Sequence, residues 1–139
     1  MAPTADGPRQ YIESILARDW EKVKDLLHPE YTYTGSDGKE MAGPGAALAI
    51  AQTMTGAFPD LHVETRSVHT AGDVAIAEMV ASGAQRGDLM GIAPTGKRMA
   101  MPVALFLELS DGSIYREREY FDMMSVLVPL GVVSPPGKA

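Results

Sequence analysis

The sequence contains no cysteine, and this absence excludes two kinds of stabilising site. Neither a disulfide framework nor a thiolate zinc site can form without cysteine. A chain of 139 residues nevertheless buries about two-thirds of its unfolded surface, so it can hold a core without such cross-links. We therefore expect one domain over residues 1–139, with tails at residues 1–8 and 134–139, where proline and glycine are frequent.

Positive charge and long apolar segments are also scarce. Twelve Lys and Arg residues stand against 18 Asp and Glu residues, and the formal net charge of −6 argues against a nucleic-acid partner. No stretch approaches the roughly 20 apolar residues that cross a membrane. Residues 1–10 are polar and lack the apolar run of a signal peptide. The sequence predicts a cytoplasmic protein with neither a nucleic-acid nor a membrane partner.

Motifs for metals and common cofactors are missing as well. The three histidines, His28, His62 and His69, are too widely spaced to indicate a metal-ligand set. The sequence has no glycine-rich nucleotide loop and no Gly-x-Ser-x-Gly nucleophile elbow. If the protein is an enzyme, we expect it to work without a cofactor or a metal.

The apolar residues that are present predict helices first and strands afterwards. Spacings of three and four indicate helix over residues 8–27, with Asp19 capping a second piece, and residues 46–57 form another helix. This order is typical of an α+β protein, in which helices pack on one face of a curved antiparallel or mixed sheet. We expect a cone that the N-terminal helices close around an internal apolar pocket. The predicted strands are 31–34, 61–69, 74–85, 97–109 and 113–121, followed by a short helix over 122–130.

Strand alternation indicates which side chains line that pocket. Residues of 97–109 with odd numbers share one face, and the opposite face, with Ala104 and Phe106, suits a homodimer contact. Methionine and leucine walls suit a hydrophobic small-molecule substrate. The candidate substrate-binding residues are Tyr33, Met79, Gln85, Met90, Met99, Met101, Leu105 and Tyr120.

The densest group of ionisable side chains lies at residues 115–122. In an extended strand, Arg118 and Asp122 share one face, and Glu117 and Glu119 share the other. At the deep end of an apolar pocket, the carboxyl group of Asp122 would have a raised pKa and could transfer protons near neutral pH. Arg118 would oppose that shift and could hold an oxyanion. The alternative is an exposed strand with alternating salt bridges.

Four stretches resemble the SnoaL-like polyketide cyclases, within the larger group that includes ketosteroid isomerases and scytalone dehydratases. The resemblance runs from about residue 11 to residue 131. Its stretches are AFPDLHVE at 57–64, GDLMGIAPTGKR at 87–98, DGSI at 111–114, and REYFD at 118–122 followed by Leu127 and Leu130-Gly131.

This resemblance implies a cone-shaped fold, assembly as a homodimer or homotetramer, and an aspartate acid/base at Asp122 with Arg118 as its partner. In the cyclases such an aspartate removes a proton beside a carbonyl, and the enolate then attacks an aldehyde of the same molecule. We therefore expect a cyclase or isomerase that acts on a polyketide-like or terpenoid carbonyl compound. A non-catalytic binding protein and a cofactor-free oxygenase are the alternatives.

The sequence departs from the family pattern at three positions. Many members carry a histidine at the position of Gln85, and the cyclases carry one near Leu105. Stabilisation of an enolate must then come from other groups. The isomerases place their base at about the position of Thr34, which cannot serve as that base, so we do not expect steroid isomerisation by the same residues.

Overall fold

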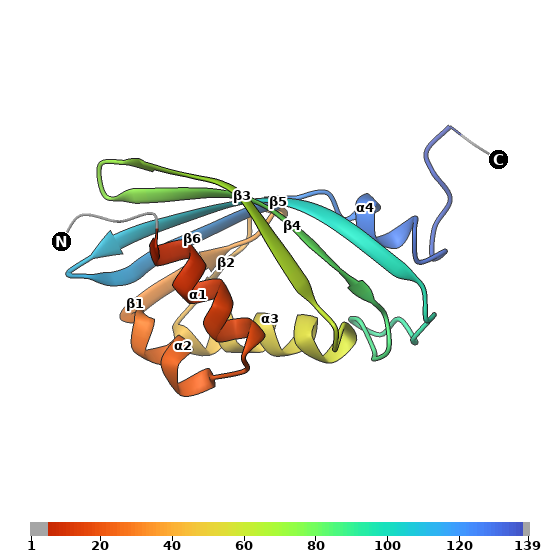
Figure 1. Ribbon diagram of the computed structural model, residues 1–139, viewed down its shortest axis with the longest axis horizontal. Helices are drawn as coiled ribbons and strands as arrows, with labels where there is room; N and C mark the ends of the chain where they lie inside the picture. The colour runs from red at the N-terminus through yellow and green to blue at the C-terminus, as the bar shows by residue number, and fades with distance from the viewer. Residues whose placement is uncertain (1–5, 138–139) are drawn as a thin grey trace.

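The computed structural model describes residues 6–137, which form a curved six-stranded sheet with helices against one face (Figure 1). Residues 1–5 and 138–139 lie outside the described part. In chain order the elements are α1 (Asp6–Leu16), α2 (Trp20–Leu26), β1 (Leu27–Thr34), β2 (Glu40–Ala42), α3 (Pro44–Ala57), β3 (His62–Ala71), β4 (Val74–Ala84), β5 (Arg98–Ser110), β6 (Ser113–Phe121) and α4 (Met124–Leu127).

The sheet is mixed and open. Its strand order is β2-β1-β6-β5-β4-β3, so β2 and β3 are its edges. Strands β3 to β6 form an antiparallel meander, and β1 joins β6 in parallel. Helices α1, α2 and α3 lie together on one side of the sheet in Figure 1. We call the face towards these helices the inner face and the opposite face the outer face. The predicted α+β architecture is confirmed, although the sheet does not close on itself.

The N-terminal helices follow the sequence pattern with some differences at the ends. Asp19 caps α2 as predicted, because its carboxylate accepts a hydrogen bond from the Lys22 amide at 3.2 Å. Helix α1 begins at Asp6 and the Pro8 side chain is buried, so residues 6–8 belong to the fold and not to a tail. Strand β1 begins at Leu27, earlier than the predicted strand, and the short strand β2 was not predicted.

The core fills the space between the inner face and the helices. Along β5, odd-numbered residues from Met99 to Leu107 are buried and even-numbered residues are more exposed, which is the pattern of a strand with one covered face. Helix α3 contains no charged residue and packs five buried side chains. The apolar face predicted for this strand is therefore confirmed as the inner face. No helix within residues 6–137 is long and apolar enough to span a membrane.

Candidate active site

A β-bulge determines which β6 side chains reach the inner face. The β5–β6 turn is tight, with positive φ angles at Asp111 (53°) and Gly112 (80°), as a type I′ turn requires. Leu109 pairs with Ile114, whereas Glu108 pairs with Arg116, so Tyr115 is an extra residue in β6. From Arg116 onward the two strands are in regular register.

The bulge brings two carboxyl groups to the inner face. Glu117 pairs with Leu107 and Glu119 pairs with Leu105, and paired residues of antiparallel strands lie on the same face. Both leucines are buried in the core. Sequence alternation alone had already placed Glu117 and Glu119 together, but on the face that we expected to be turned away from the pocket.

Glu117 is the centre of a buried hydrogen-bonded cluster. Its Oε1 atom accepts hydrogen bonds from the Tyr11 hydroxyl at 2.7 Å and from the Tyr31 hydroxyl at 2.5 Å. Only 4% of Glu117 is exposed. Burial raises the pKa of Glu117, and the hydrogen bonds from Tyr31 and Tyr11 oppose that rise. Burial and the Glu117 charge raise the pKa of both phenols, so the tyrosines act as proton donors to the carboxylate.

Glu119 lies beside this cluster and is more accessible than Glu117. It is half-buried, and Tyr33 of β1 lies next to it. Removal from water and the neighbouring Glu117 charge raise the pKa of Glu119 to about 8, and the neighbouring Tyr33 hydroxyl opposes this rise. Within residues 6–137, neither carboxyl group has a Lys, Arg or His partner within 4 Å. The site can therefore hold a carboxyl group that gains and loses a proton near neutral pH.

The two residues predicted to be catalytic lie elsewhere. Arg118 is on the outer face, where its Nη1 atom is 3.3 Å from a carboxylate oxygen of Glu108, and it does not pair with Asp122. Asp122 follows the end of β6 and is exposed. Its Oδ1 atom accepts a hydrogen bond from the Met124 amide at 2.9 Å at the start of α4. The expected pair of Arg118 and Asp122 inside the pocket is therefore not formed.

Most of the predicted apolar wall lies on the inner face. Tyr33 is also buried there, near Glu119. Met79, Met99, Met101 and Leu105 all belong to the buried core between the sheet and the helices. Their contact with a ligand stays a prediction.

Gln85 does not offer its amide to a substrate. It is 0% exposed, and its Nε2 group donates to the carbonyl oxygens of Gly87 (3.2 Å) and Ile92 (3.0 Å). Its Oε1 atom accepts from both the amide and the hydroxyl of Thr95, each at 3.1 Å. The polar atoms of Gln85 are thus used to shape the loop between β4 and β5.

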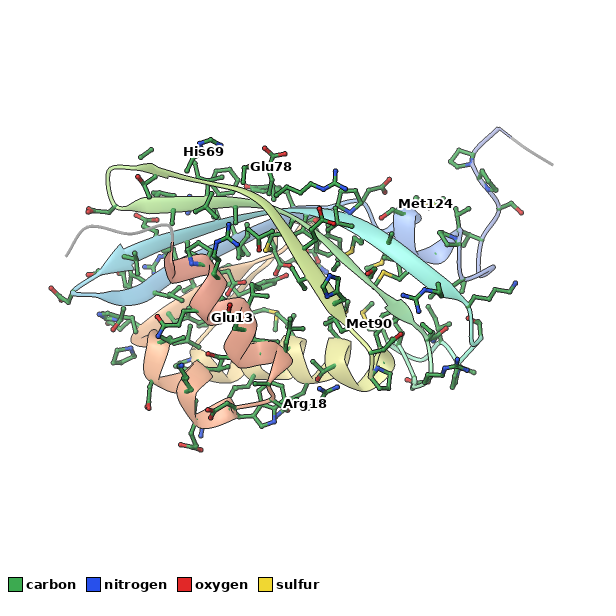
Figure 2. The ribbon with its side chains drawn as sticks, in the orientation of Figure 1. Glu13, Arg18, His69, Glu78, Met90 and Met124 are labelled. Carbon is green, nitrogen blue, oxygen red and sulfur yellow. The ribbon has the colours of Figure 1, made fainter. Side chains whose placement is uncertain are left out.

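Met90 projects from the same loop. It is 66% exposed, with a φ angle of 47°, and lies near the end of α3 in Figure 2. The loop can approach α3 closely because Gly87 has no side chain: a Cβ atom there would lie 2.2 Å from the Gly56 carbonyl oxygen. Met90 is therefore placed at the surface and not in the core wall.

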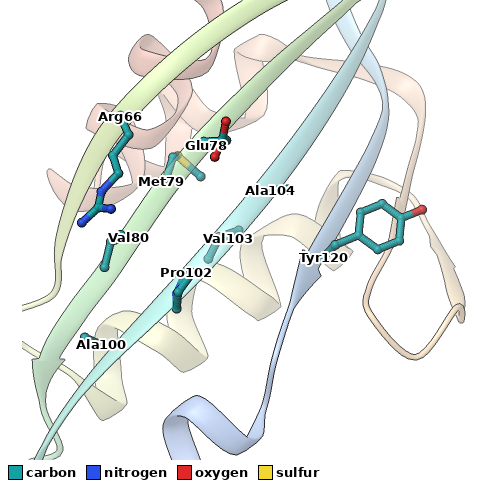
Figure 3. A pocket seen from close by; sticks show the side chains of 9 residues that line it. All are labelled: Arg66, Glu78, Met79, Val80, Ala100, Pro102, Val103, Ala104 and Tyr120. Carbon is teal, nitrogen blue, oxygen red and sulfur yellow. The ribbon is translucent and has the colours of Figure 1, made fainter.

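A shallow hollow of about 460 Å³ lies on the outer face (Figure 3). Pro102 and Ala104 of β5, Glu78 of β4 and Tyr120 of β6 are among its lining residues. Tyr120 is 51% exposed, and its ring packs edge-on against Phe106 at 5.8 Å between centroids. In Figure 2, Glu78 points away from the helices, in agreement with an outer position. Tyr120, predicted to bind substrate in the internal pocket, therefore lies on the opposite face from Glu119.

Sequence reasoning missed Glu117, Glu119, Tyr11 and Tyr31 as site residues. The available signal was the alternation of Tyr31 and Tyr33 together with that of the two glutamates, which predicts two matched pairs on neighbouring strands. Tyr11 lies within the apolar spacing of residues 8–27, which predicts only a core position on a helix. Two features bring these residues together: the bulge at Tyr115 and the parallel pairing of β1 with β6. Both depend on contacts between segments that are far apart in the sequence.

Comparison with known proteins gives the family from the sequence and the fold from solved structures. The sequence profile of the SnoaL-like polyketide cyclases matches residues 6–130. Aklanonic acid methyl ester cyclase AcmA from Streptomyces galilaeus is 26% identical over 125 residues, which cover 88% of this chain and 87% of AcmA.

Two solved structures share the fold. IdmH from Streptomyces antibioticus, a proposed polyketide cyclase, superposes with a TM-score of 0.79 at 23% identity, covering 91% of this chain and 97% of IdmH. AclR from Streptomyces galilaeus, a proposed hydroxylase, gives a TM-score of 0.83 at 20% identity, covering 95% of this chain and 87% of AclR. The fold thus accommodates different proposed activities, and the profile match decides the family: the chain belongs to the SnoaL-like polyketide cyclases.

Proposed function

We propose that this protein is a cofactor-independent cyclase for a hydrophobic polyketide-like carbonyl compound, with Glu119 as its general acid/base. The observation that carries the proposal is the position of Glu119: it is a half-buried carboxyl group on the inner face with a pKa of about 8. Asp122, which the sequence favoured as the acid/base, is exposed, and its carboxyl group accepts a hydrogen bond from the Met124 amide at the start of α4. A general acid/base works best when its pKa is close to the working pH.

The proposed reaction is an intramolecular aldol ring closure. The carboxylate form of Glu119 removes a proton from the carbon beside a carbonyl, and the resulting enolate carbon attacks a second carbonyl carbon of the same molecule. Glu119, now protonated, returns the proton to the new alkoxide, so the reaction needs no added oxidant or reductant. The hydroxyl of Tyr33, beside Glu119, is the nearest phenol that could donate a hydrogen bond to the enolate oxygen.

The surroundings of Glu119 suit an apolar substrate. Met79, Met101 and Leu105 form a buried apolar wall on the same face, and Leu105 pairs directly with Glu119. An environment poor in water strengthens the interaction of Glu119 with developing charge. Because AcmA is named as an aklanonic acid methyl ester cyclase, that ester is the first substrate to test.

The test compares two carboxyl groups near the end of β6. Purified wild-type protein, Glu119→Gln and Asp122→Asn are incubated with aklanonic acid methyl ester, and the cyclised product is quantified by liquid chromatography with mass spectrometry. We expect Glu119→Gln to reduce kcat by about 10²–10⁴-fold, the usual contribution of a general acid/base. Asp122→Asn should retain activity within about tenfold of wild type, because the carboxyl group of Asp122 lies outside the inner face.

The reverse result would restore Asp122 as the catalytic residue and would contradict the role of Glu119. Circular dichroism and urea unfolding of both variants separate a loss of catalysis from a loss of folding.

A binding protein without catalysis is the second candidate. The observations that favour it are the hydrogen-bonded state of Gln85 and the apolar Leu105, at positions where the family pattern led us to expect histidine. Under this function, the wild-type protein would bind the ester, as measured by fluorescence titration, but would return it unchanged after prolonged incubation.

A further inference from the structure

We propose that Glu117 is a positioning residue for the reaction: held by the phenols of Tyr11 and Tyr31, it carries a negative charge that keeps the proton of the glutamate pair on Glu119. This inference rests on the proposed function, in which Glu119 is the acid/base. It assigns a role to three residues that would not themselves touch the reacting atoms.

The geometry gives Glu117 the better site for a negative charge. Two phenols from different elements, α1 and β1, converge on the same Oε1 atom at 2.7 Å and 2.5 Å. Hydrogen bonds to an ionised carboxylate are roughly twice as strong as those between neutral groups. The neighbouring Glu119 carboxyl group also favours the charged form of Glu117. Glu119 has Tyr33 as its phenol neighbour, so the charge is better stabilised on Glu117.

Among residues 6–137, no cationic side chain lies close enough to compensate a second negative charge. The groups that face the pair are Tyr11 from α1, Tyr31 and Tyr33 from β1, and the apolar Leu105 and Leu107 from β5. Helix α3 has no charged side chain. Two like charges in a water-poor space repel strongly, so one proton remains on the pair over a wide pH range.

The two glutamates differ in access, and this difference divides their roles. Glu117 is 4% exposed and enclosed by tyrosines, whereas Glu119 is half-buried. A proton held on Glu119 is therefore the one that a ligand at the inner face can exchange. Glu117 sets the pH range in which that proton is available, and Tyr11 and Tyr31 keep Glu117 in its charged form.

Carbon-13 NMR titration of the glutamate side chains tests this inference without a substrate. The protein is labelled at the glutamate Cδ position, and the Glu119 and Glu117 signals are assigned from the variants Glu119→Gln and Glu117→Gln. In Glu117→Gln, we expect the midpoint of the Glu119 titration to fall by at least about one pH unit, because the neighbouring charge is gone. It should stay above the ordinary glutamate value, since removal from water is the largest cause of its shift.

Two further variants sharpen the experiment. Tyr31→Phe removes one donor to Glu117, so the Glu117 signal should show protonation at a pH where it is ionised in wild type. Glu108→Gln is the matched control: it removes a carboxyl group from the outer face, where Glu108 pairs with Arg118, and should leave the Glu119 titration unchanged.

A Glu119 titration that moves by less than about 0.3 unit in Glu117→Gln would overturn the inference, because a neighbouring charge must shift a coupled group. This failure is distinguishable from failure of the proposed function. The NMR result concerns where the proton resides, whereas loss of cyclisation in Glu119→Gln concerns its use.

Discussion

The two faces of strand β6 carry the same kinds of side chain in very different surroundings. On the outer face, Arg118 and Glu108 form a cross-strand ion pair in which 34% and 40% of the side chains are exposed. On the inner face, Glu117 and Glu119 have no positive partner within the described part of the chain and depend on tyrosine hydroxyls. Charged residues that alternate along β6 therefore take part in a solvated cross-strand ion pair on one face and in a proton-holding pair on the other. The face, more than the residue type, determines the chemistry.

Exchanging the side chains at positions 116 and 117 between the two faces of β6 should disturb the inner face most severely. The double variant Arg116→Glu with Glu117→Arg keeps the composition but replaces the shared acceptor of the Tyr11 and Tyr31 hydroxyls with a guanidinium, which cannot accept a hydrogen bond. Each buried hydrogen bond to a charged group contributes about 1.5–3 kcal/mol, so we expect a loss of about 3–6 kcal/mol in the free energy of unfolding, measured by urea denaturation.

An exchange confined to the outer face is the control for this variant. Glu108→Arg with Arg118→Glu reverses an existing ion pair, which should change stability by about 1 kcal/mol or less. Similar losses in the two double variants would show that the inner and outer faces do not differ as described.

Much of the fold follows from local sequence patterns. The helical spacing, the Asp19 cap, the Asp111-Gly112 turn and the buried face of β5 are all visible in the sequence and are all present in the structure. Each of them depends on residues close together in the chain. The single-residue alternation of β5 was sufficient to find the inner wall.

The faces of β6 could not be predicted in the same way. An uninterrupted ladder from the Asp111-Gly112 turn would place Arg118 opposite Leu105 on the inner face, whereas the bulge places Glu119 there. The extra residue, Tyr115, packs edge-on against His28 at 4.9 Å and lies under the Arg116 guanidinium. His28 is far away in sequence, so no local pattern indicates the bulge. This one extra residue places Arg118 on the outer face, whereas Asp122 lies beyond the end of the strand.

A smaller effect should distinguish the tyrosines of the two faces. Tyr31→Phe removes a hydrogen bond to the buried Glu117 carboxylate, and bonds to charged groups contribute about 1.5–3 kcal/mol. We expect a loss in that range in the free energy of unfolding. Tyr120→Phe makes the same chemical change on the outer face, where the side chain is half exposed, and should change stability by about 0.5 kcal/mol or less. Equal losses would contradict the assignment of Tyr31 as an essential donor.

The last expected effect is a pH dependence of stability that originates on the inner face. The pKa of Glu119 is about 8 in the folded protein, against an ordinary value of 4.5. Between these two pH values the folded state binds a proton that the unfolded state has lost, so the free energy of unfolding decreases as pH rises. The contribution of Glu119 is fully present below about pH 4.5 and is lost once the pH passes about 8.

Glu117 also has a raised pKa and adds a slope of the same sign, so the comparison must be between variants. Asp60 does not contribute in this range: the backbone amide of Ala84 and then Arg98 lower its pKa, so its contribution to stability is lost only as the pH falls below its ordinary value of 3.8. Urea midpoints measured from pH 5 to 9 at constant ionic strength should decline less in Glu119→Gln than in wild type, whereas Glu108→Gln should keep the wild-type slope. If Glu108→Gln and Glu119→Gln change the slope equally, then the outer carboxyl group titrates as the inner one does. The raised pKa could then not be a property of the inner face, since Glu108 has an ion-pair partner and Glu119 has none.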